Sequence, residues 1–115
     1  MAVVELPTTP HRAGFRIARE AGECILWVIG EHDISTVHAL RLVLTDVIAL
    51  DESDVVVDLT EATFVGSVMI GELLRARKHL ADRDRWLTVR APRASVRRMF
   101  EICDVRDLFH LRSVG

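Results

Sequence analysis

Ser67 lies where a buried strand is expected to give way to a helix. Residues 55–59 form the apolar run that predicts the strand, and an amphipathic stretch follows the serine. The first N–H groups of a helix have no partners within the helix and have partial positive charge, so an oxygen atom or a phosphate is favoured there. Ser67 is therefore a candidate phosphoacceptor. The alternative is that its hydroxyl only caps the helix, a common role of serine.

The residues beside Ser67 match none of the common serine or nucleotide motifs. A nucleophile elbow requires glycine two residues before and two residues after the serine, where this chain has Val65 and Met69. Gly66 and Gly71 do not form a phosphate-binding loop, because the sequence lacks the Walker spacing, its Lys-Ser/Thr end and a GxGxxG run. We therefore expect no enzymatic activity and no cofactor.

Carboxylates and histidines suggest one further kind of site. Glu31, Asp33 and Asp58 lie near the ends of the first strands, so a ligand-binding or enzymatic domain remains an alternative. Asp58 is expected instead to accept hydrogen bonds from backbone N–H groups where its strand ends. His32 lies between two carboxylates, a grouping that a solvated polar loop explains better than a metal, and the two cysteines are too far apart for a CxxC unit. We expect no metal site.

The composition is that of one globular domain. The chain has 115 residues, of which half are hydrophobic and 28% are charged. Residues 1–12 contain two prolines and predict a flexible leader before a domain at residues 13–115. No apolar run reaches the roughly 18 residues of a membrane span, and the first residues lack a signal-peptide pattern, so we expect a cytoplasmic protein without a membrane partner.

Charge is divided unevenly along the chain, although the net charge is only −2. Residues 1–74 contain 4 Lys/Arg and 12 Asp/Glu, a net of −8, whereas residues 75–115 contain 11 and 5, a net of +6. We expect the two halves to neutralise each other on folding, with steering of a charged partner as the alternative. The net acidic charge, the six aromatic residues and the lack of a recognition motif argue against direct binding of nucleic acid.

Strand and helix patterns alternate after an opening hairpin. Predicted strands are residues 15–19, 24–29, 54–59, 86–90 and 108–111, and predicted helices are residues 37–50, a segment from Ser67 to about residue 83, and residues 93–103. Glu72 and Arg75 fall on the polar side of the second helix, whereas one of Val68 and Met69 is expected to turn into the core. This order predicts an α/β fold with a mixed sheet of four to five strands and amphipathic helices packed against it.

Two segments resemble the STAS domain, in particular the stand-alone anti-anti-sigma factors of bacteria. Residues 30–36, Gly-Glu-His-Asp-Ile-Ser-Thr, resemble the family's Gly-Glu-x-Asp-hydrophobic loop before the first helix. Residues 55–71 resemble a strand that ends in Asp-Leu and is followed by Phe-x-Asp-Ser-Ser-Gly-hydrophobic-Gly. In this chain Gly66, Val68 and Met69 replace the family's Asp, second Ser and first Gly. The resemblance covers roughly residues 15–111.

In that family the serine that matches Ser67 is phosphorylated by an anti-sigma factor that is also an ATP-dependent kinase, and only the unphosphorylated form binds this partner and frees the sigma factor. The resemblance therefore implies an anti-sigma factor antagonist, a monomer or weak homodimer, with Ser67 as phosphoacceptor. A second form of the hypothesis is a STAS interaction module that binds without being phosphorylated. The implied partner-binding residues are Glu31, His32, Asp33, Ser35, Thr36, Gly66, Ser67, Val68, Met69, Glu72 and Arg75.

Overall fold

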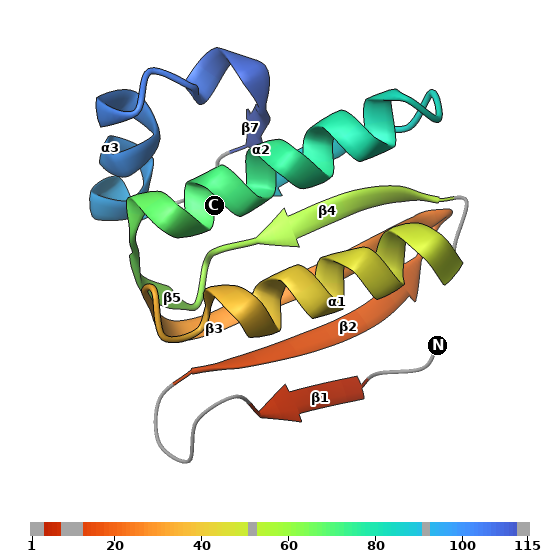
Figure 1. Cartoon of the computed structure of the whole chain (residues 1–115), viewed down its shortest axis with the longest axis horizontal. Helices are drawn as coiled ribbons and strands as arrows, with labels where there is room; N and C mark the ends of the chain where they lie inside the picture. Colours follow the sequence, from red (N-terminus) through yellow and green to blue (C-terminus); the bar gives the residue numbers. More distant parts are fainter. Residues whose placement is uncertain (1–3, 8–12, 51–52, 91–92, 113–115) are drawn as a thin grey trace.

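The turn Ala21-Gly22 joins two antiparallel strands, β2 (Gly14–Glu20) and β3 (Glu23–His32). Both turn residues have positive φ, 50° and 79°, as a two-residue hairpin turn of type I′ requires, and glycine adopts this conformation without steric cost. The computed structural model describes residues 4–7, 13–50, 53–90 and 93–112, and within these residues the hairpin forms one side of a mixed sheet (Figure 1).

Parallel strands extend the sheet beyond the hairpin. β4 (Asp54–Asp58) pairs with β3, β6 (Leu87–Arg90) pairs with β4, and β7 (His110–Arg112) pairs with β6. The connections contain α1 (Val37–Leu50), α2 (Ser67–Ala81), α3 (Ala94–Ile102) and the short 3-10 helix η1 (Arg106–Leu108). α1 and α2 lie side by side over one face of the sheet (Figure 1). Because β3 and β4 are parallel, the helices that follow them start at the same edge of the sheet.

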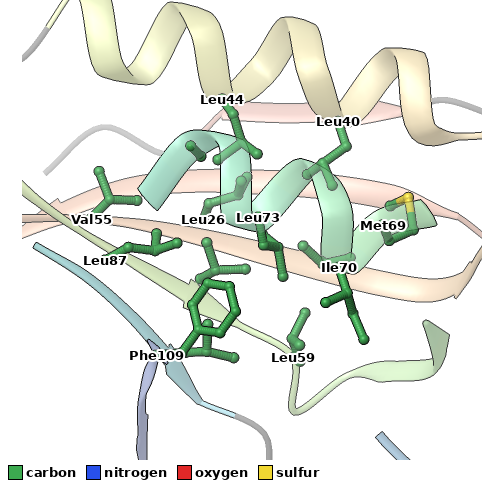
Figure 2. Close-up of a cluster of buried hydrophobic side chains, with 14 of the residues drawn as sticks. Leu26, Leu40, Leu44, Val55, Leu59, Met69, Ile70, Leu73, Leu87 and Phe109 are labelled. Carbon is green, nitrogen blue, oxygen red and sulfur yellow. The ribbon is translucent and has the colours of Figure 1, made fainter. Parts of the chain in front are cut away.

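The core lies between the sheet and these two helices (Figure 2). The central strand β4 contributes Val55 and Val57 to this core. Val56, between them, is also fully buried, because a parallel strand covered on both faces is apolar on both. The helices contribute apolar residues at helical spacing: Leu40, Val43, Leu44, Val47, Ile48, Met69, Ile70, Leu73, Ala76 and Leu80. Full burial of one leucine-sized side chain is worth about 1.5–3 kcal/mol, so this core fixes both helices and the loops at their starts.

The predicted α/β fold is confirmed, and the structure adds two short strands to the five predicted. β1 (Val4–Pro7) pairs with β2, so four residues of the predicted flexible leader form an edge strand, a place where a terminal proline is tolerated. Residues 1–3 and 8–12 of that leader lie outside the described residues. β5 (Ala62–Val65) pairs with β3 inside the segment predicted as a loop.

β3 is longer than predicted, because it continues past Gly30 to His32. A bulge between Gly30 and Glu31, with Gly30 at φ 87°, bends the strand so that its last residues pair with β5. This extension brings residues 31–33 beside the segment that leads into α2. In the described parts of the chain, no helix is long and apolar enough to cross a membrane.

Candidate protein-docking site around Ser67

Ser67 is exposed and is the first residue of α2. Gly66 occupies the N-cap position in an extended conformation, φ −80° and ψ 168°, and no side chain of the described residues caps the helix. The Gly66 carbonyl accepts hydrogen bonds from the N–H groups of Met69 (3.1 Å) and Ile70 (3.4 Å). The alternative that Ser67 caps α2 is therefore wrong, because the cap lies one residue earlier. The Ser67 side chain therefore lies at the surface, in the first turn of α2, where a modifying enzyme could reach it.

Residues 33–36, called the 33–36 loop below, form a tight turn beside the start of α2. Asp33 Oδ1 accepts hydrogen bonds from the N–H (2.8 Å) and the hydroxyl (2.6 Å) of Ser35, and the Thr36 N–H donates to the Asp33 carbonyl (3.1 Å). The hydrogen bond from the Ser35 hydroxyl is the main cause that lowers the pKa of Asp33 from its ordinary value. The Gly66 N–H donates to the His32 carbonyl (3.0 Å), which ties the loop to the α2 start.

Four of the predicted partner-binding residues are buried and do not present their side chains to a partner: His32, Thr36, Met69 and Glu72. The prediction placed the three polar residues at the surface, but each of them has an internal hydrogen-bond partner that offsets the cost of its burial in this fold. Of the apolar pair beside Ser67, Met69 is the residue in the core, whereas Val68 is exposed. Glu31, Asp33, Ser35 and Ser67 are exposed, and Gly66 and Arg75 are half-buried.

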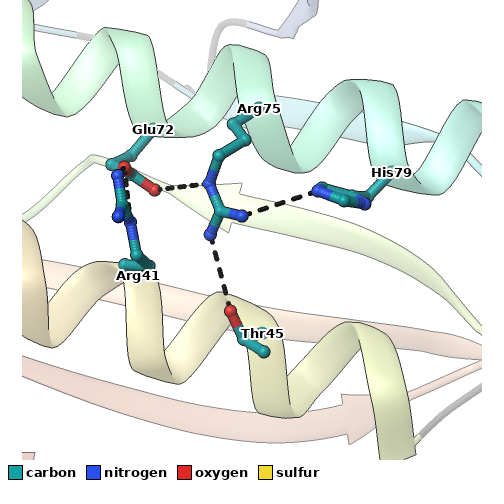
Figure 3. A network of polar contacts seen from close by, with 5 residues as sticks. All are labelled: Arg41, Thr45, Glu72, Arg75 and His79. Carbon is teal, nitrogen blue, oxygen red and sulfur yellow. Dashed lines mark hydrogen bonds and ion pairs between the residues drawn. The ribbon is translucent and has the colours of Figure 1, made fainter.

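Glu72 joins α2 to α1 through a network of polar contacts (Figure 3). Arg41 of α1 donates from Nε to Glu72 Oε1 (2.9 Å) and makes a second, ion-paired contact through Nη2, while Arg75 Nε donates to Oε2 (3.1 Å). Arg75 also reaches Thr45 of α1 (3.5 Å). The hydrogen bond from Arg41, opposed by burial, lowers the pKa of Glu72 from its ordinary value. Glu72 therefore fixes the orientation of α2 rather than contacting a partner.

Exposed apolar side chains lie on the segments next to Ser67, and of these only Val68 was among the predicted partner-binding residues. Ile34 in the 33–36 loop is 74% exposed, Phe64 on β5 is 48% exposed, and Val68 in the first turn of α2 is 41% exposed. The Phe64 ring lies beside Gly66, since a Cβ added there would be 3.5 Å from Cε2 of the ring. The sequence signal was present in Ile34, a single large apolar residue within a polar loop. We call Ile34, Phe64 and Val68 the apolar rim.

The carboxylates considered for enzymatic or ligand chemistry have structural contacts or lie apart. Asp58 is buried, accepts a hydrogen bond from the Thr60 N–H (2.9 Å) and pairs with Arg90 (3.4 Å), so it serves the strand end as predicted. A cavity of about 280 Å³ lies at the other end of α2, lined by Arg77, Ala81, Asp84, Arg85, Trp86 and Leu87, and includes none of the three carboxylates. The described residues contain no group of three His, Cys, Asp or Glu side chains that could hold a metal.

Several solved structures share the fold of this chain. An anti-sigma factor antagonist from Mycobacterium paratuberculosis superposes with a TM-score of 0.80 at 24% identity, covering 91% of this chain and 89% of the other. The anti-sigma factor antagonist SpoIIAA in its unphosphorylated form gives 0.76 at 16% identity, with 88% of each chain covered. The Bacillus cell fate determinant SpoIIAA in the phosphorylated form gives 0.69 at 14% identity, covering 88% and 91%.

Sequence comparison assigns the family. Comparison with curated proteins gives no match. The family model described as Mlab, STAS domain, matches residues 15–112, which span the sheet from β2 to β7, all three helices and the Ser67 segment. The chain therefore belongs to the STAS domain family, and its fold is that of anti-sigma factor antagonists.

Proposed function

We propose that this protein is an anti-sigma factor antagonist that regulates transcription in the cytoplasm by binding an anti-sigma factor. The observation that supports the proposal is the exposed Ser67 at the start of α2, next to the exposed Val68, with the exposed Phe64 beside Gly66. The exposed 33–36 loop is tied to the same helix start by the hydrogen bond from the Gly66 N–H to the His32 carbonyl. Large apolar side chains exposed on adjoining segments of a small domain are typical of a surface that a partner covers. The likeness to anti-sigma factor antagonists adds support from the fold.

Phosphorylation of Ser67 would act on the interface and leave the fold intact. A phosphate adds about −1.5 to −2 charges, which the N-terminal dipole of α2 favours. The same charge would lie among the apolar side chains that the partner has to cover, beside the acidic 33–36 loop. Docking would then bury a charge without a compensating partner, so the phosphorylated protein should bind weakly.

A second candidate is constitutive binding without phosphorylation, and Gly66 favours it. Gly66 has a negative φ, and a Cβ at this position would make only ordinary van der Waals contacts, of 3.5 Å to Phe64 and 3.8 Å to the His32 carbonyl. The backbone therefore does not require glycine. Replacement of the family's Asp removes a carboxylate that could orient the serine or accept its proton during phosphoryl transfer.

The test is to incubate the purified protein with ATP, Mg²⁺ and each candidate anti-sigma kinase from its own organism, and to measure intact mass and complex formation. Phosphate on Ser67, absent from Ser67→Ala and retained in Ser95→Ala, supports a partner switch. A stable complex without a mass change supports constitutive binding, and phosphorylation gained in Gly66→Asp would then identify residue 66 as the cause. Failure of every candidate to bind the unphosphorylated protein would overturn the proposal.

A further inference from the structure

His32 is a buried histidine between two exposed carboxylates. It has no exposed surface, whereas Glu31 and Asp33 are both exposed. The side chain lies under the 33–36 loop, and its ring is 5.1 Å from the ring of Phe15 on β2, centroid to centroid. Its main-chain carbonyl holds the Gly66 N–H, so the residue contacts the α2 start through its backbone and the 33–36 loop through its ring.

Both ring nitrogens of His32 have hydrogen-bond partners. Nε2 lies 2.8 Å from the Ile29 carbonyl, so it must donate, and Nδ1 lies 3.1 Å from the Thr36 hydroxyl. In a neutral ring, Nδ1 is then an acceptor, and the Thr36 hydroxyl donates to it. Thr36 has two other acceptors within reach, the Asp33 carbonyl at 3.2 Å and the sulfur of Met69 at 3.9 Å.

A second proton on the ring would change these contacts. Nδ1 would become a donor, and the Thr36 hydroxyl would have to turn toward Asp33 or Met69. The ring would also hold a full positive charge without contact with water, which is the main reason that the pKa of His32 is lowered. The backbone contacts at Ile29 and Gly14 and the carboxylate of Asp33 oppose this effect without cancelling it. We call the loop closed when it is held against the start of α2 and open when it is released. The closed state therefore favours the neutral form of the His32 ring.

We propose that His32 and Thr36 position the 33–36 loop against the start of α2 while the His32 ring is neutral, and release it when the ring takes up a second proton. The inference rests on the proposed docking function for its biological meaning, because the same loop presents Ile34 and Asp33 to the partner. Release of the loop would separate these residues from Ser67 and Val68 and dismantle the docking surface.

The direction of the pH effect follows from proton linkage. A histidine whose pKa is lowered in the closed state binds fewer protons there than in the open state. The closed state of the loop is therefore fully stabilised when the pH is above 6.5, the ordinary pKa of histidine. This stabilisation decreases as the pH falls below 6.5, until the ring is protonated in both the closed and the open state. One proton changes the closing equilibrium by at most about tenfold per pH unit.

NMR on the isolated protein tests the proposal without a partner. We would follow the ring signals of His32 and the hydrogen exchange of the Gly66 and Thr36 amides between pH 7.5 and 5, corrected for intrinsic exchange. Both amides are internally bonded, to the carbonyls of His32 and Asp33. We expect their protection to fall below about pH 6.5, by up to about tenfold per pH unit, together with the ring titration. Protection that is independent of pH would overturn the proposal.

Two variants separate positioning by the ring from simple packing. His32→Gln offers an uncharged amide that can donate to Ile29 and accept from Thr36, so protection should persist and lose its pH dependence. His38→Gln, which changes an exposed histidine on α1, should keep the pH dependence of the natural protein. The same pH slope in His32→Gln would overturn the proposal.

Thr36→Val serves if His32→Gln does not fold. It removes the hydroxyl that donates to the neutral ring, so the pKa of His32 should rise toward its ordinary value and protection should fall mainly at high pH, which flattens its pH dependence. A uniform loss of protection at every pH would indicate packing alone and would overturn the proposal. Because no partner is present in these measurements, their failure leaves the proposed function standing, and failure to find an anti-sigma partner leaves the loop assignment standing.

Discussion

The starts of α2 and α3 have the same local geometry and different surroundings. Each helix follows an extended N-cap residue, Gly66 or Arg93, and in neither case does a side chain of the described residues cap the helix. Each has an exposed serine in its first turn, Ser67 in α2 and Ser95 in α3. The dipole and the unpaired N–H groups are therefore common to both starts.

The neighbours of the two serines differ in kind. Ser67 is surrounded by the apolar rim and by the acidic 33–36 loop, which β3 and β5 hold in place. Ser95 follows Arg93, an exposed arginine that donates to the Thr60 carbonyl (3.4 Å), and precedes the arginines at 97 and 98. A helix N-terminus with an exposed serine is therefore not enough to form a docking site. The surface contributed by other segments distinguishes Ser67 from Ser95, and the role that we propose for Ser67 depends on this surface.

The same negative charge placed at both helix starts tests whether their surroundings matter for binding. Ser67→Glu should keep the fold, because a carboxylate is favoured at a helix N-terminus, and should weaken binding of the anti-sigma factor about 30- to 100-fold, or ~2–3 kcal/mol. Ser95→Glu should leave the affinity unchanged. Calorimetric titration of both variants with the partner measures the difference, and equal affinities would remove the special role of Ser67.

The attachment of α2 can be weakened without touching its exposed start. Glu72→Gln should lower the free energy of unfolding at pH 7 by about 1–2 kcal/mol. This expected loss of stability is smaller than that for a fully buried ion pair, because the side chains of Arg41 and Arg75 are 54% and 40% exposed and water screens their charges. Chemical denaturation measures it, with Glu101→Gln, an exposed acid paired with Arg106 at 3.7 Å, as the control.

The same pair of variants gives a pH test. Hydrogen bonding to Arg41 lowers the pKa of Glu72, so its contribution is complete above its ordinary value of 4.5 and is lost as the pH falls through the lowered value. The natural protein and Glu72→Gln should therefore converge in stability below about pH 4. A difference that stays constant down to pH 3 would show that the loss comes from packing rather than charge.

Apolar spacing was enough to predict most of the fold. α1 has the predicted bounds, 37–50, because its buried residues recur every three or four positions, and the valine run of β4 is a clear signal of a covered strand. β1 was missed because the two prolines of residues 1–12 predicted a flexible leader, and β5 was missed because it alternates poorly, with both central residues exposed. Their pairing with β2 and β3 defines them, and pairing is not visible along the chain.

The helix start at Ser67 was predicted, whereas the burial of several residues around it was not. Ser67 was located within one residue of the helix start by the change from strand to helix pattern. Glu72 and His32 were expected at the surface because isolated polar residues are usually exposed. Their burial depends on partners such as Arg41, 31 residues from Glu72, and the Ile29 carbonyl, which only the folded chain brings within reach.

A smaller effect is expected from trimming the apolar rim. Ile34→Ser should weaken binding of the anti-sigma factor by about 1 kcal/mol, or roughly fivefold, with little change in stability because the side chain is 74% exposed. Ile102→Ser changes a side chain that is 67% exposed at the end of another helix, α3, and should leave binding unchanged. The affinities of the two variants for the anti-sigma factor can be compared by surface plasmon resonance. Equal losses of affinity in both variants would argue against the apolar rim as the contact surface.

The smallest effect is expected from removing the hydroxyl of Ser67. A serine at an N-cap is worth about 0.5–2 kcal/mol, but Gly66 occupies that position in α2. Ser67→Ala should therefore change the free energy of unfolding by less than about 0.5 kcal/mol, and alanine's higher helix propensity favours a slight gain. Ser95→Ala should behave alike in denaturant titrations, because its serine also lies inside the first turn. A loss of about 1 kcal/mol in Ser67→Ala alone would show that its hydroxyl caps the helix in solution, and the two helix starts would then differ in local geometry as well as in surroundings.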